Sequence, residues 1–570
     1  MSEKPDNSNN KPVNLRPIYF QPGQLIFQTH GNLNDTPDLA QKLITWANEL
    51  APSGIIISDP DEILNFNPVE KPGSKNQSSH YEKRENTLKM LAEQTKGHYK
   101  PPPLKNHPPF SLVLAKVEGE NWPDPPSLDS EHTEEDEEAE IQANALNELL
   151  DLAIFLDERR DKAPITLEVV SPNWLISGGS SDPGGTGGPG DRPSPVDNSD
   201  ANNYHITTNL DQLSELPGFF KGVSQPDTGN DVVVAILDTS YSKNELEDIH
   251  KIWVLDKPEE EQHPIIKALL SNDPLHPGAL REANGQLRVH TDPTVDNYLP
   301  GLTIDGHDYD MTDHGLFVAG IINSLAPKAE IHLYQVLNKY GLGDLRSIAR
   351  ALQQVFNDFQ EIKLVVNLSL TMNMPLEEGH LKANDVLGVG RKILERKTSI
   401  ERQSMIFEWI CDLVYTLDSR VIAAAGNESK GSDQRPGALY PAAFDRVLGV
   451  GALAYADGSV APASYSNLAD KPTNDGITTF GGEAKEKGIL GVYVGEFPKD
   501  DGGNVPKNTN GWTWWSGTSF ATPIISGITT AVLSKLPGAI TEEAIIKLFE
   551  AQTKTTGDNE DVLTVAQGPQ

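Results

Sequence analysis

The 570-residue sequence has a single cysteine, Cys411, and no apolar run long enough to cross a membrane. One cysteine excludes an intrachain disulfide framework and is typical of a reducing compartment. The N-terminal segment MSEKPDNSNNKPVN is polar, whereas a signal peptide has an apolar centre. We therefore expect a cytoplasmic protein that has no membrane partner.

Positive charge is also scarce. The 47 lysines and arginines stand against 82 aspartates and glutamates, which gives a formal net charge of -35. Such a surface repels phosphate backbones and anionic lipids, so nucleic acid is not expected as a partner. Apolar residues make up only 37% of the chain, so part of it should be linker or solvated loop. The length predicts two or more domains.

One segment has almost no apolar residues. It covers residues 177–203 and reads SGGSSDPGGTGGPGDRPSPVDNSDANN. Such a sequence cannot bury enough surface to offset its ordering entropy, so it is predicted to be a flexible linker. We therefore divide the chain into an N-terminal module at 15–176, a linker at 177–203 and a C-terminal domain at 204–570.

The N-terminal module shows a mixed pattern of strands and helices, which predicts a smaller α+β domain. The order, βαβ followed by βαβ, is that of a ferredoxin-like sheet, with residues 60–108 as a loop insertion. The predicted elements are a strand or a hairpin around Pro22-Gly23 at 17–29, a helix from Pro37, strands at 54–58 and 110–117, a helix from Thr133, and a strand at 165–170.

Beyond the linker, short apolar runs alternate with helical patterns. Runs of this kind suit parallel strands buried on both faces, so we expect a doubly wound, mostly parallel α/β sheet. Helices are predicted at 344–359 and over much of 384–417. The predicted strands lie at 231–237, 331–337, 363–368, 421–424 and 447–452.

Four residues at the ends of these elements have the chemistry of acyl transfer to water. Asp238 follows the first strand, His314 lies in DHGLFVAGII, Asn427 in AAAGNES and Ser519 in GTSFATP. A serine hydroxyl needs an adjacent base, and histidine can act as that base if a carboxylate fixes its tautomer. An amide and a backbone N–H at a helix start can stabilise the oxyanion.

The joint pattern resembles the subtilase family over residues 231–549, in the order Asp, His, Asn, Ser. The motifs GTSFATP at 517–523, NLSL at 367–370 and YPA at 440–442 contribute to the resemblance. Subtilisin itself carries its triad along the chain in the order Asp, His, Ser. The resemblance implies a subtilisin-like serine endopeptidase in which Asp238, His314 and Ser519 form the triad and Asn427 donates to the oxyanion.

The same resemblance implies a cleft that pairs with an extended protein or peptide substrate as an added strand. Thr371 stands where the family commonly has glycine, so its side chain is expected to narrow the cleft. Leu439 would favour small residues in the primary pocket and Glu428 basic ones, and these two expectations remain open. The substrate-binding residues implied are Gly341, Gly343, Ser369, Leu370, Thr371 and Glu428.

The chemistry implied requires no cofactor. A group of acidic residues could nevertheless bind structural calcium, since calcium prefers oxygen ligands and family members often bind it. The alternative, a simple loop, is the plainer interpretation. The group comprises Asp305, Asp308, Asp310 and Asp313.

The sequence leaves two questions open. The N-terminal module is either a prodomain that chaperones and inhibits the enzyme, or a regulatory module that binds a protein partner; we favour regulation. The whole protein is either an active endopeptidase or a catalytically silent relative that acts as a peptide-binding scaffold, and the four intact chemical positions favour the enzyme.

Overall fold

The computed structural model describes residues 20–33, 36–67, 78–94, 100–105, 107–119, 135–178, 193–196, 228–270, 287–292, 294–295, 310–360, 362–372, 374, 389–429, 435–456, 459–473, 475–483, 488–498 and 504–550. Within these ranges, none of the helices combines the length and the apolar character that crossing a membrane requires.

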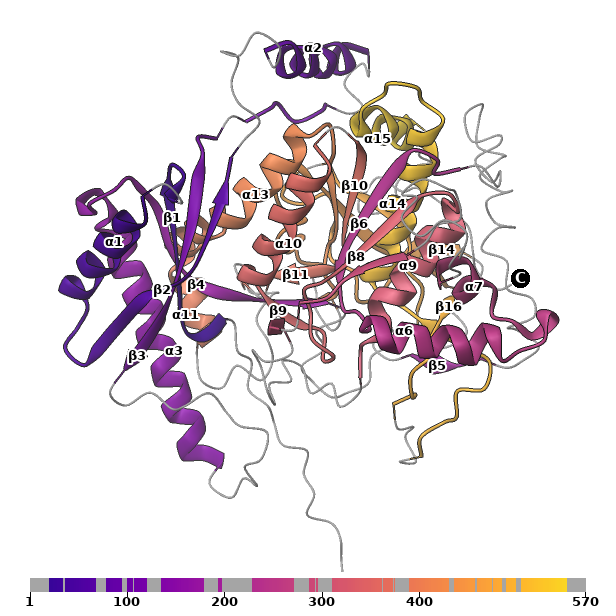
Figure 1. Cartoon of the computed structure of the whole chain (residues 1–570), viewed down its shortest axis with the longest axis horizontal. Helices are drawn as coiled ribbons and strands as arrows, with labels where there is room; N and C mark the ends of the chain where they lie inside the picture. Colours follow the sequence, from indigo (N-terminus) through magenta and orange to yellow (C-terminus); the bar gives the residue numbers. More distant parts are fainter. Residues whose placement is uncertain are drawn as a thin grey trace, which may run out of the picture.

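The larger sheet confirms the predicted α/β class (Figure 1). Its strand order is β14-β13-β12-β10-β6-β8-β7, with β15 beside β13, and every pairing is parallel except β13 with β14. The strands are β6 (Val232–Asp238), β7 (Leu287–His290), β8 (Glu330–Gln335), β10 (Lys363–Leu368), β12 (Val421–Ala424), β13 (Val447–Ala456), β14 (Ser459–Pro462) and β15 (Ile477–Phe480).

Strand β6 explains why these sequences are apolar without a break. Every residue of β6 is buried. Val233, Ala235 and Leu237 belong to one apolar core, whereas the alternate residues Val232, Val234 and Ile236 belong to a second core on the opposite face. A strand with a core on each face has no polar side, so the alternating pattern of a half-buried strand is absent.

Helices cover both faces of this sheet. On one face α9 (Asp313–Leu325) and α14 (Thr518–Ser534) pack against each other and against β6, and on the other lie α10 (Leu345–Asp358) and α13 (Met405–Thr416). The helix predicted at 344–359 is α10. Among the described residues, the other α-helices of this domain are α6 (Lys243–His250), α7 (Pro264–Leu270), α11 (Val389–Glu395), α12 (Lys397–Gln403) and α15 (Thr541–Glu550).

The N-terminal module forms a second sheet, at the left of Figure 1, with strand order β4-β1-β3-β2 and antiparallel pairing throughout. The segment predicted as an insertion contains a helix and the end of a strand, so the loop prediction is wrong there. The elements are β1 (Phe20–His30), α1 (Pro37–Leu50), β2 (Ile55–Phe66), α2 (Ser78–Gln94), β3 (Phe110–Gly119), α3 (Glu135–Asp157) and β4 (Leu167–Gly178). Thr133 lies outside the described residues.

The alternative of a hairpin around Pro22-Gly23 is also wrong, because β1 is one continuous strand. Gly23 has a left-handed φ of 66°, and the pairing of β1 with β4 shifts register between Phe20 and Leu25. A Cβ at Gly23 would lie 2.8 Å from the carbonyl oxygen of Val117. The glycine therefore permits an irregularity within a strand rather than a turn between two strands.

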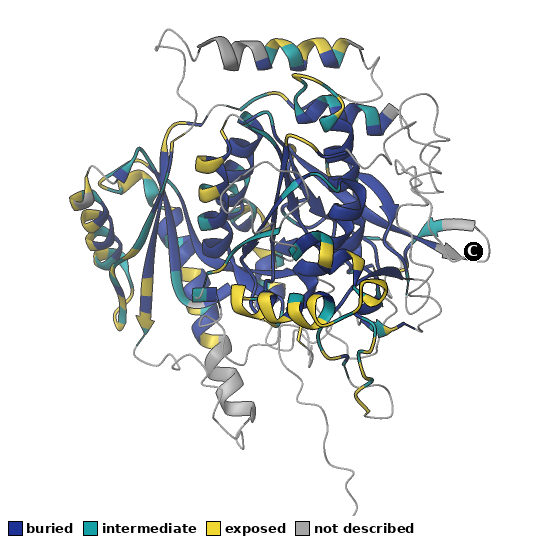
Figure 2. Ribbon diagram, turned by 45° about the vertical axis from the view of Figure 1, so that its right-hand side comes forward, coloured by how far each residue is buried: buried dark blue, intermediate teal, exposed yellow. Residues whose placement is uncertain are grey.

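The two sheets share one apolar core. The core that contains Phe27 of β1 and Val169 of β4 also contains Leu352 of α10 and Val414 of α13. Figure 2 shows this continuous buried region between the module and the larger sheet. The module is therefore packed onto the domain through α10 and α13.

Strand β4 extends beyond the module. Its last residues pair with two short strands of the C-terminal domain, β9 (Leu342–Asp344) and β11 (Leu370–Met372). The segment predicted as linker therefore begins inside a strand. Main-chain hydrogen bonds do not require apolar side chains, so composition gives no sign of this pairing. Within the same predicted linker, β5 (Ser194–Pro195) pairs with β17 (Trp512–Trp515).

Candidate active site

An aspartate and a histidine form a buried pair at one edge of the larger sheet. Asp238 is the last residue of β6, and His314 lies in the first turn of α9. His314 Nδ1 is 2.7 Å from Asp238 Oδ1, and neither side chain is exposed. Among the described residues, His314 Nε2 has no hydrogen-bond partner. This arrangement orients an imidazole whose second nitrogen remains available to take a proton.

Ser519 lies in the first turn of α14, which begins at Thr518 directly after Gly517. Its Oγ donates to the carbonyl oxygen of Ser369 at 3.3 Å, and its own carbonyl accepts from Ser369 Oγ at 2.7 Å. The ring of Phe520, the next residue, lies 5.1 Å from the ring of His314 between centroids. The serine is thus fixed to the strand segment at 367–370 and lies next to a residue that packs on the histidine.

Asn427 lies just past β12 and is fixed to the residue before the serine. Its Oδ1 accepts hydrogen bonds from both the backbone N–H and the hydroxyl of Thr518, each at 3.0 Å. Because the carboxamide oxygen is held in this way, the NH₂ group is directed away from Thr518. An amide donor placed beside the nucleophile's helix start can stabilise an oxyanion.

Four of the six residues predicted to bind substrate, namely Gly341, Gly343, Leu370 and Thr371, are already paired with strand β4 of the same chain. Gly178 N donates to Gly341 O at 2.9 Å, and Ile176 lies opposite Gly343. On the other side of β4, Gly178 lies opposite Leu370 and Ser177 lies opposite Thr371. Strand β4 thus lies between β9 and β11 as the middle strand of three. The side chain of Thr371 does not prevent this pairing.

Glu428 lies apart from these strands, next to Asn427. Its backbone N–H donates to Asn467 Oδ1 at 3.0 Å, and its Oε2 accepts from Asn467 Nδ2 at 2.8 Å. A Cβ on Gly426 would lie 2.5 Å from Glu428 Oε2 and 3.1 Å from Leu439 Cδ1. Glu428 and Leu439 therefore approach the same glycine.

Two contributions are not predicted from the sequence. Thr518, which holds Asn427, is part of the GTSFATP motif, but the sequence assigns it no role. Leu337 packs against β4 at Gly178, where a Cβ would come within 2.3 Å of Leu337 Cδ1. Leu337 therefore requires glycine at position 178. The apolar letters WLI at 174–176, which follow the predicted strand, are the one available sign that β4 continues.

The acidic group is only partly described, since Asp305 and Asp308 lie outside the described residues. Asp310 accepts from the backbone N–H and the hydroxyl of Thr312, and Asp313 accepts from protein donors as well. In the described part of the chain, no three His, Cys, Asp or Glu side chains form a group that could hold a metal ion.

Comparison with known proteins gives the family. The subtilase family matches residues 229–568, more than half of the chain. Subtilisin DY from Bacillus licheniformis is 27% identical over 258 residues, which are 44% of this chain and 73% of that protein. A thermostable alkaline protease from Halalkalibacterium halodurans is 27% identical over 238 residues, 40% of this chain and 49% of its own length.

Among solved structures, fervidolysin from Fervidobacterium pennivorans, a keratinolytic enzyme related to subtilisin, is 14% identical with a TM-score of 0.47. The match covers 99% of this chain and 64% of fervidolysin. The match of the family to residues 229–568 carries the assignment. This chain belongs to the subtilase family and is a subtilisin-like serine protease.

Proposed function

We propose that the protein is a serine endopeptidase in which Ser519 attacks the scissile carbonyl. His314 Nε2 takes the hydroxyl proton and later gives it to the leaving amine, while Asp238 holds the imidazole and stabilises its cation. Asn427 and the backbone N–H of Ser519 donate to the oxyanion. The observation that carries this proposal is the buried 2.7 Å contact of His314 Nδ1 with Asp238.

A fluorophosphonate probe tests this proposal, because it reacts with a serine only when that serine is activated. We expect one covalent adduct on Ser519 in the wild type and none in Ser519→Ala. His314→Gln should also abolish labelling while the protein stays folded. The end of β4 lies between the predicted cleft strands, and Gly178→Val is expected to displace it. A folded protein that is labelled neither as wild type nor as Gly178→Val would favour the silent scaffold.

We further propose that the N-terminal module inhibits the protease by placing the end of β4 where substrate must bind. This is supported by the pairing of Gly178 and Ser177 with both predicted cleft strands. An extended substrate needs the same main-chain donors and acceptors, so it competes with β4. The strand order β4-β1-β3-β2 supports a ferredoxin-like fold for the module.

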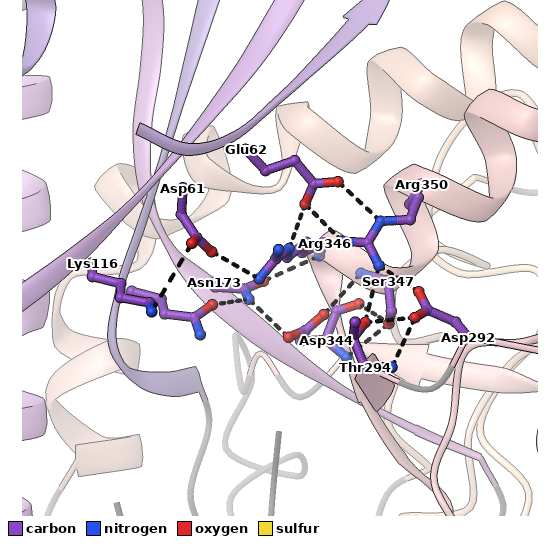
Figure 3. Close-up of polar contacts among 11 residues, drawn as sticks. Asp61, Glu62, Lys116, Asn173, Asp292, Thr294, Asp344, Arg346, Ser347 and Arg350 are labelled. Carbon is purple, nitrogen blue, oxygen red and sulfur yellow. Dashed lines mark hydrogen bonds and ion pairs between the residues drawn. The ribbon is translucent and has the colours of Figure 1, made fainter. Parts of the chain in front are cut away.

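The module is held by a network of charged residues on α10 (Figure 3). Arg350 makes two hydrogen bonds to Glu62 of β2, at 2.9 and 2.8 Å. Arg346 also contacts Glu62, and its backbone N–H donates to Asn173 of β4 at 3.2 Å. Paired hydrogen bonds from arginine to carboxylate fix orientation as well as adding energy. The network therefore favours one docking position for the module.

A second contact holds the module to α13. His107 Nε2 lies 2.7 Å from Asp412 Oδ2, and both side chains are almost completely buried. Arg446 joins the same carboxylate at 3.2 Å and donates to the carbonyl oxygen of Pro103 at 2.8 Å. Breaking this contact is costly, since a buried nitrogen of His107 and a buried oxygen of Asp412 would each lose a hydrogen-bond partner. We therefore propose that regulation moves the end of β4 rather than the whole module, and that a protein partner supplies the signal.

Gly178→Val tests the inhibition. The new Cβ would collide with Leu337, so the end of β4 should leave the cleft and peptide hydrolysis should rise about tenfold or more. The matched control adds Leu337→Ala to Gly178→Val, which restores space and should lower activity toward that of Leu337→Ala alone. Equal activity of the wild type and Gly178→Val would contradict inhibition by β4.

We propose protein or peptide substrates with small residues in the primary pocket. Leu439 approaches Gly426, and the carboxylate of Glu428 already accepts a hydrogen bond from Asn467, which favours a small occupant over a basic one. We also propose a reducing, cytoplasmic location, consistent with the free and buried Cys411. The chemistry proposed requires no cofactor, and calcium at the acidic group remains a separate proposal.

A further inference from the structure

Asp313, the residue before His314, is buried and accepts three hydrogen bonds from groups outside its own helix. Its Oδ1 accepts from Val494 N at 2.8 Å. Its Oδ2 accepts from Gly495 N at 2.8 Å and from Tyr241 Oη at 2.9 Å. Only 2% of the residue is exposed. The proposed reaction gives this carboxylate no role.

The three bonds join the segments that carry the proposed triad. Tyr241 lies in the loop that begins at Asp238, and Asp313 itself begins α9 directly before His314. The segment that contains Val494 and Gly495 follows β16 (Ile489–Val492). Strand β16 pairs with β17 (Trp512–Trp515), which leads to Ser519. One carboxylate therefore joins the loop after Asp238 to the start of α9 directly, and it is connected to the segment of Ser519 through the pairing of β16 with β17.

The packing around Asp313 leaves little freedom for another arrangement. A Cβ on Gly495 would lie 2.4 Å from Asp313 Oδ2, so the loop approaches the carboxylate closely because residue 495 is glycine. Thr239 adds a contact between the same two segments, since its Oγ1 donates to Met311 O at 3.0 Å and accepts from Gly315 N at 3.0 Å. Tyr241 and Thr239 thus hold the start of α9 from two sides.

The geometry points to Asp313 as a positioning residue that keeps His314 aligned between Asp238 and Ser519. This inference rests on the proposed function and adds a residue to it. Asp313 touches no reacting atom in this arrangement. Its effect is exerted through the position of the α9 start, and reactions of this type are sensitive to displacements of about 1 Å.

The control is a carboxylate outside both the proposed site and the acidic group. Burial raises the pKa of Asp313 to about 6, with the hydrogen bonds from Val494, Tyr241 and Gly495 opposing the rise and the charge of Asp310 adding to it. Glu245, four residues after Tyr241, is exposed, and its Oε2 accepts from Ser242 N at 2.8 Å. Glu245→Gln thus removes a carboxylate charge without touching the three bonds to Asp313.

The test compares full-length Asp313→Asn with full-length Glu245→Gln. In either orientation of an asparagine side chain at 313, its NH₂ group faces a backbone N–H, so at least one bond is lost and one donor is left unpaired. We expect the rate of fluorophosphonate labelling per active site to fall about 10- to 100-fold in Asp313→Asn. In Glu245→Gln it should change less than about twofold, because glutamine can still accept the hydrogen bond from Ser242 N.

A spectroscopic measurement separates positioning from folding and from the proposed function itself. The measurement is the NMR resonance of the proton between His314 and Asp238, recorded on ¹⁵N-histidine-labelled full-length protein. Its loss in His314→Gln assigns it. We expect this resonance to shift or broaden in Asp313→Asn and to stay in place in Glu245→Gln. It can be observed whether or not Ser519 reacts with the probe.

The inference is overturned if Asp313→Asn leaves both the resonance and the labelling rate per active site as in the wild type. It is also overturned if the whole loss lies in the fraction of active molecules, because that is the effect of a structural role alone. If neither the wild type nor Gly178→Val is labelled, the proposed function fails, and the resonance decides on Asp313 by itself.

Discussion

Two side chains beside the proposed site, those of Leu439 and Glu428, approach Gly426. From the sequence, Leu439 and Glu428 are expected to select different substrates. In the structure the Glu428 carboxylate is bound by Asn467, whereas the Leu439 methyl group lies beside the glycine. We therefore propose that Leu439, rather than Glu428, limits the size of the substrate residue in the primary pocket.

Leu439→Gly should therefore broaden the cleavage preference. Removing the side chain makes room for larger residues, and one methylene group more or less in an apolar pocket changes kcat/KM by about 10- to 200-fold. We expect the ratio of kcat/KM for a leucine- over an alanine-containing peptide to rise by at least about tenfold, measured in the Gly178→Val background. A ratio that stays constant would show that Leu439 does not contact the substrate.

His263 makes stability sensitive to acid. Burial lowers the pKa of His263 to about 3, with the hydrogen bond to Gly511 opposing the shift. The folded state thus disfavours the protonated ring, while the unfolded state takes up a proton near pH 6.5. Stability from this group is complete above pH 6.5 and falls by about 1.4 kcal/mol per pH unit as the pH drops toward 3.

The expected result is a steeper loss of unfolding free energy below pH 6.5 in the wild type than in His263→Phe. Phenylalanine keeps an aromatic ring beside Trp512, whose ring centroid lies 4.2 Å from that of His263. Denaturant unfolding at a series of pH values measures the difference. Parallel pH curves for the two proteins would rule His263 out as the cause.

At the scale of elements, α10 joins the two sheets. Burial alone would raise the pKa of Glu62, but the hydrogen bonds and charges of Arg350 and Arg346 outweigh it and lower the pKa. The stabilisation by this pairing is therefore present above the ordinary pKa of a glutamate and is lost as the pH falls through the lower, folded value.

Glu62→Gln should lower the free energy of unfolding by about 1–3 kcal/mol, because hydrogen bonds from two arginines to a charged group are lost. Glu85→Gln is the matched control. Glu85 forms an exposed pair with Lys89 within α2, and such pairs contribute less than about 1 kcal/mol. Chemical denaturation of both variants tests the difference, and equal effects would contradict a docking role for Glu62.

The elements that could be predicted are those with a recognisable pattern of apolar side chains. The runs KLVVNL and VIAA match β10 and β12 from end to end, because a strand buried on both faces needs apolar residues throughout. Helix is predicted over much of 384–417, and the part from 389 consists of α11, α12 and α13. The breaks between these helices carry no glycine or proline, so their boundaries could not be predicted.

In the proposed site, the four catalytic residues could be predicted, whereas several of their surrounding contacts could not. Asp238, His314, Asn427 and Ser519 stand in recognisable motifs, and the structure brings Asp238 to His314 and Asn427 to the residue before Ser519. The contacts of Gly178 were not predictable, because main-chain pairing depends on the fold and not on side chains. For Asp313 the sequence suggested a calcium ligand, and it gave no sign of the hydrogen bonds from the backbone N–H groups of Val494 and Gly495.

At the scale of the whole molecule, the chain should stay associated after a cut in the linker. The module and the larger sheet share one core, and buried polar contacts hold both α10 and α13. We expect Ser519→Ala carrying a foreign protease site within 180–192 to elute as one species after cleavage, with a single thermal transition. Separation of the fragments under native conditions would contradict this.

The shared core has a consequence for the exchange of parts between relatives. Leu352 and Val414 belong to the C-terminal domain by sequence but pack with Phe27 and Val169 of the module. A chimera joined at the linker would set side chains of different origin against each other in a close-packed interior. The unit that can be exchanged is therefore the sheet of the N-terminal module together with α10 and α13. Its boundary runs through the catalytic domain.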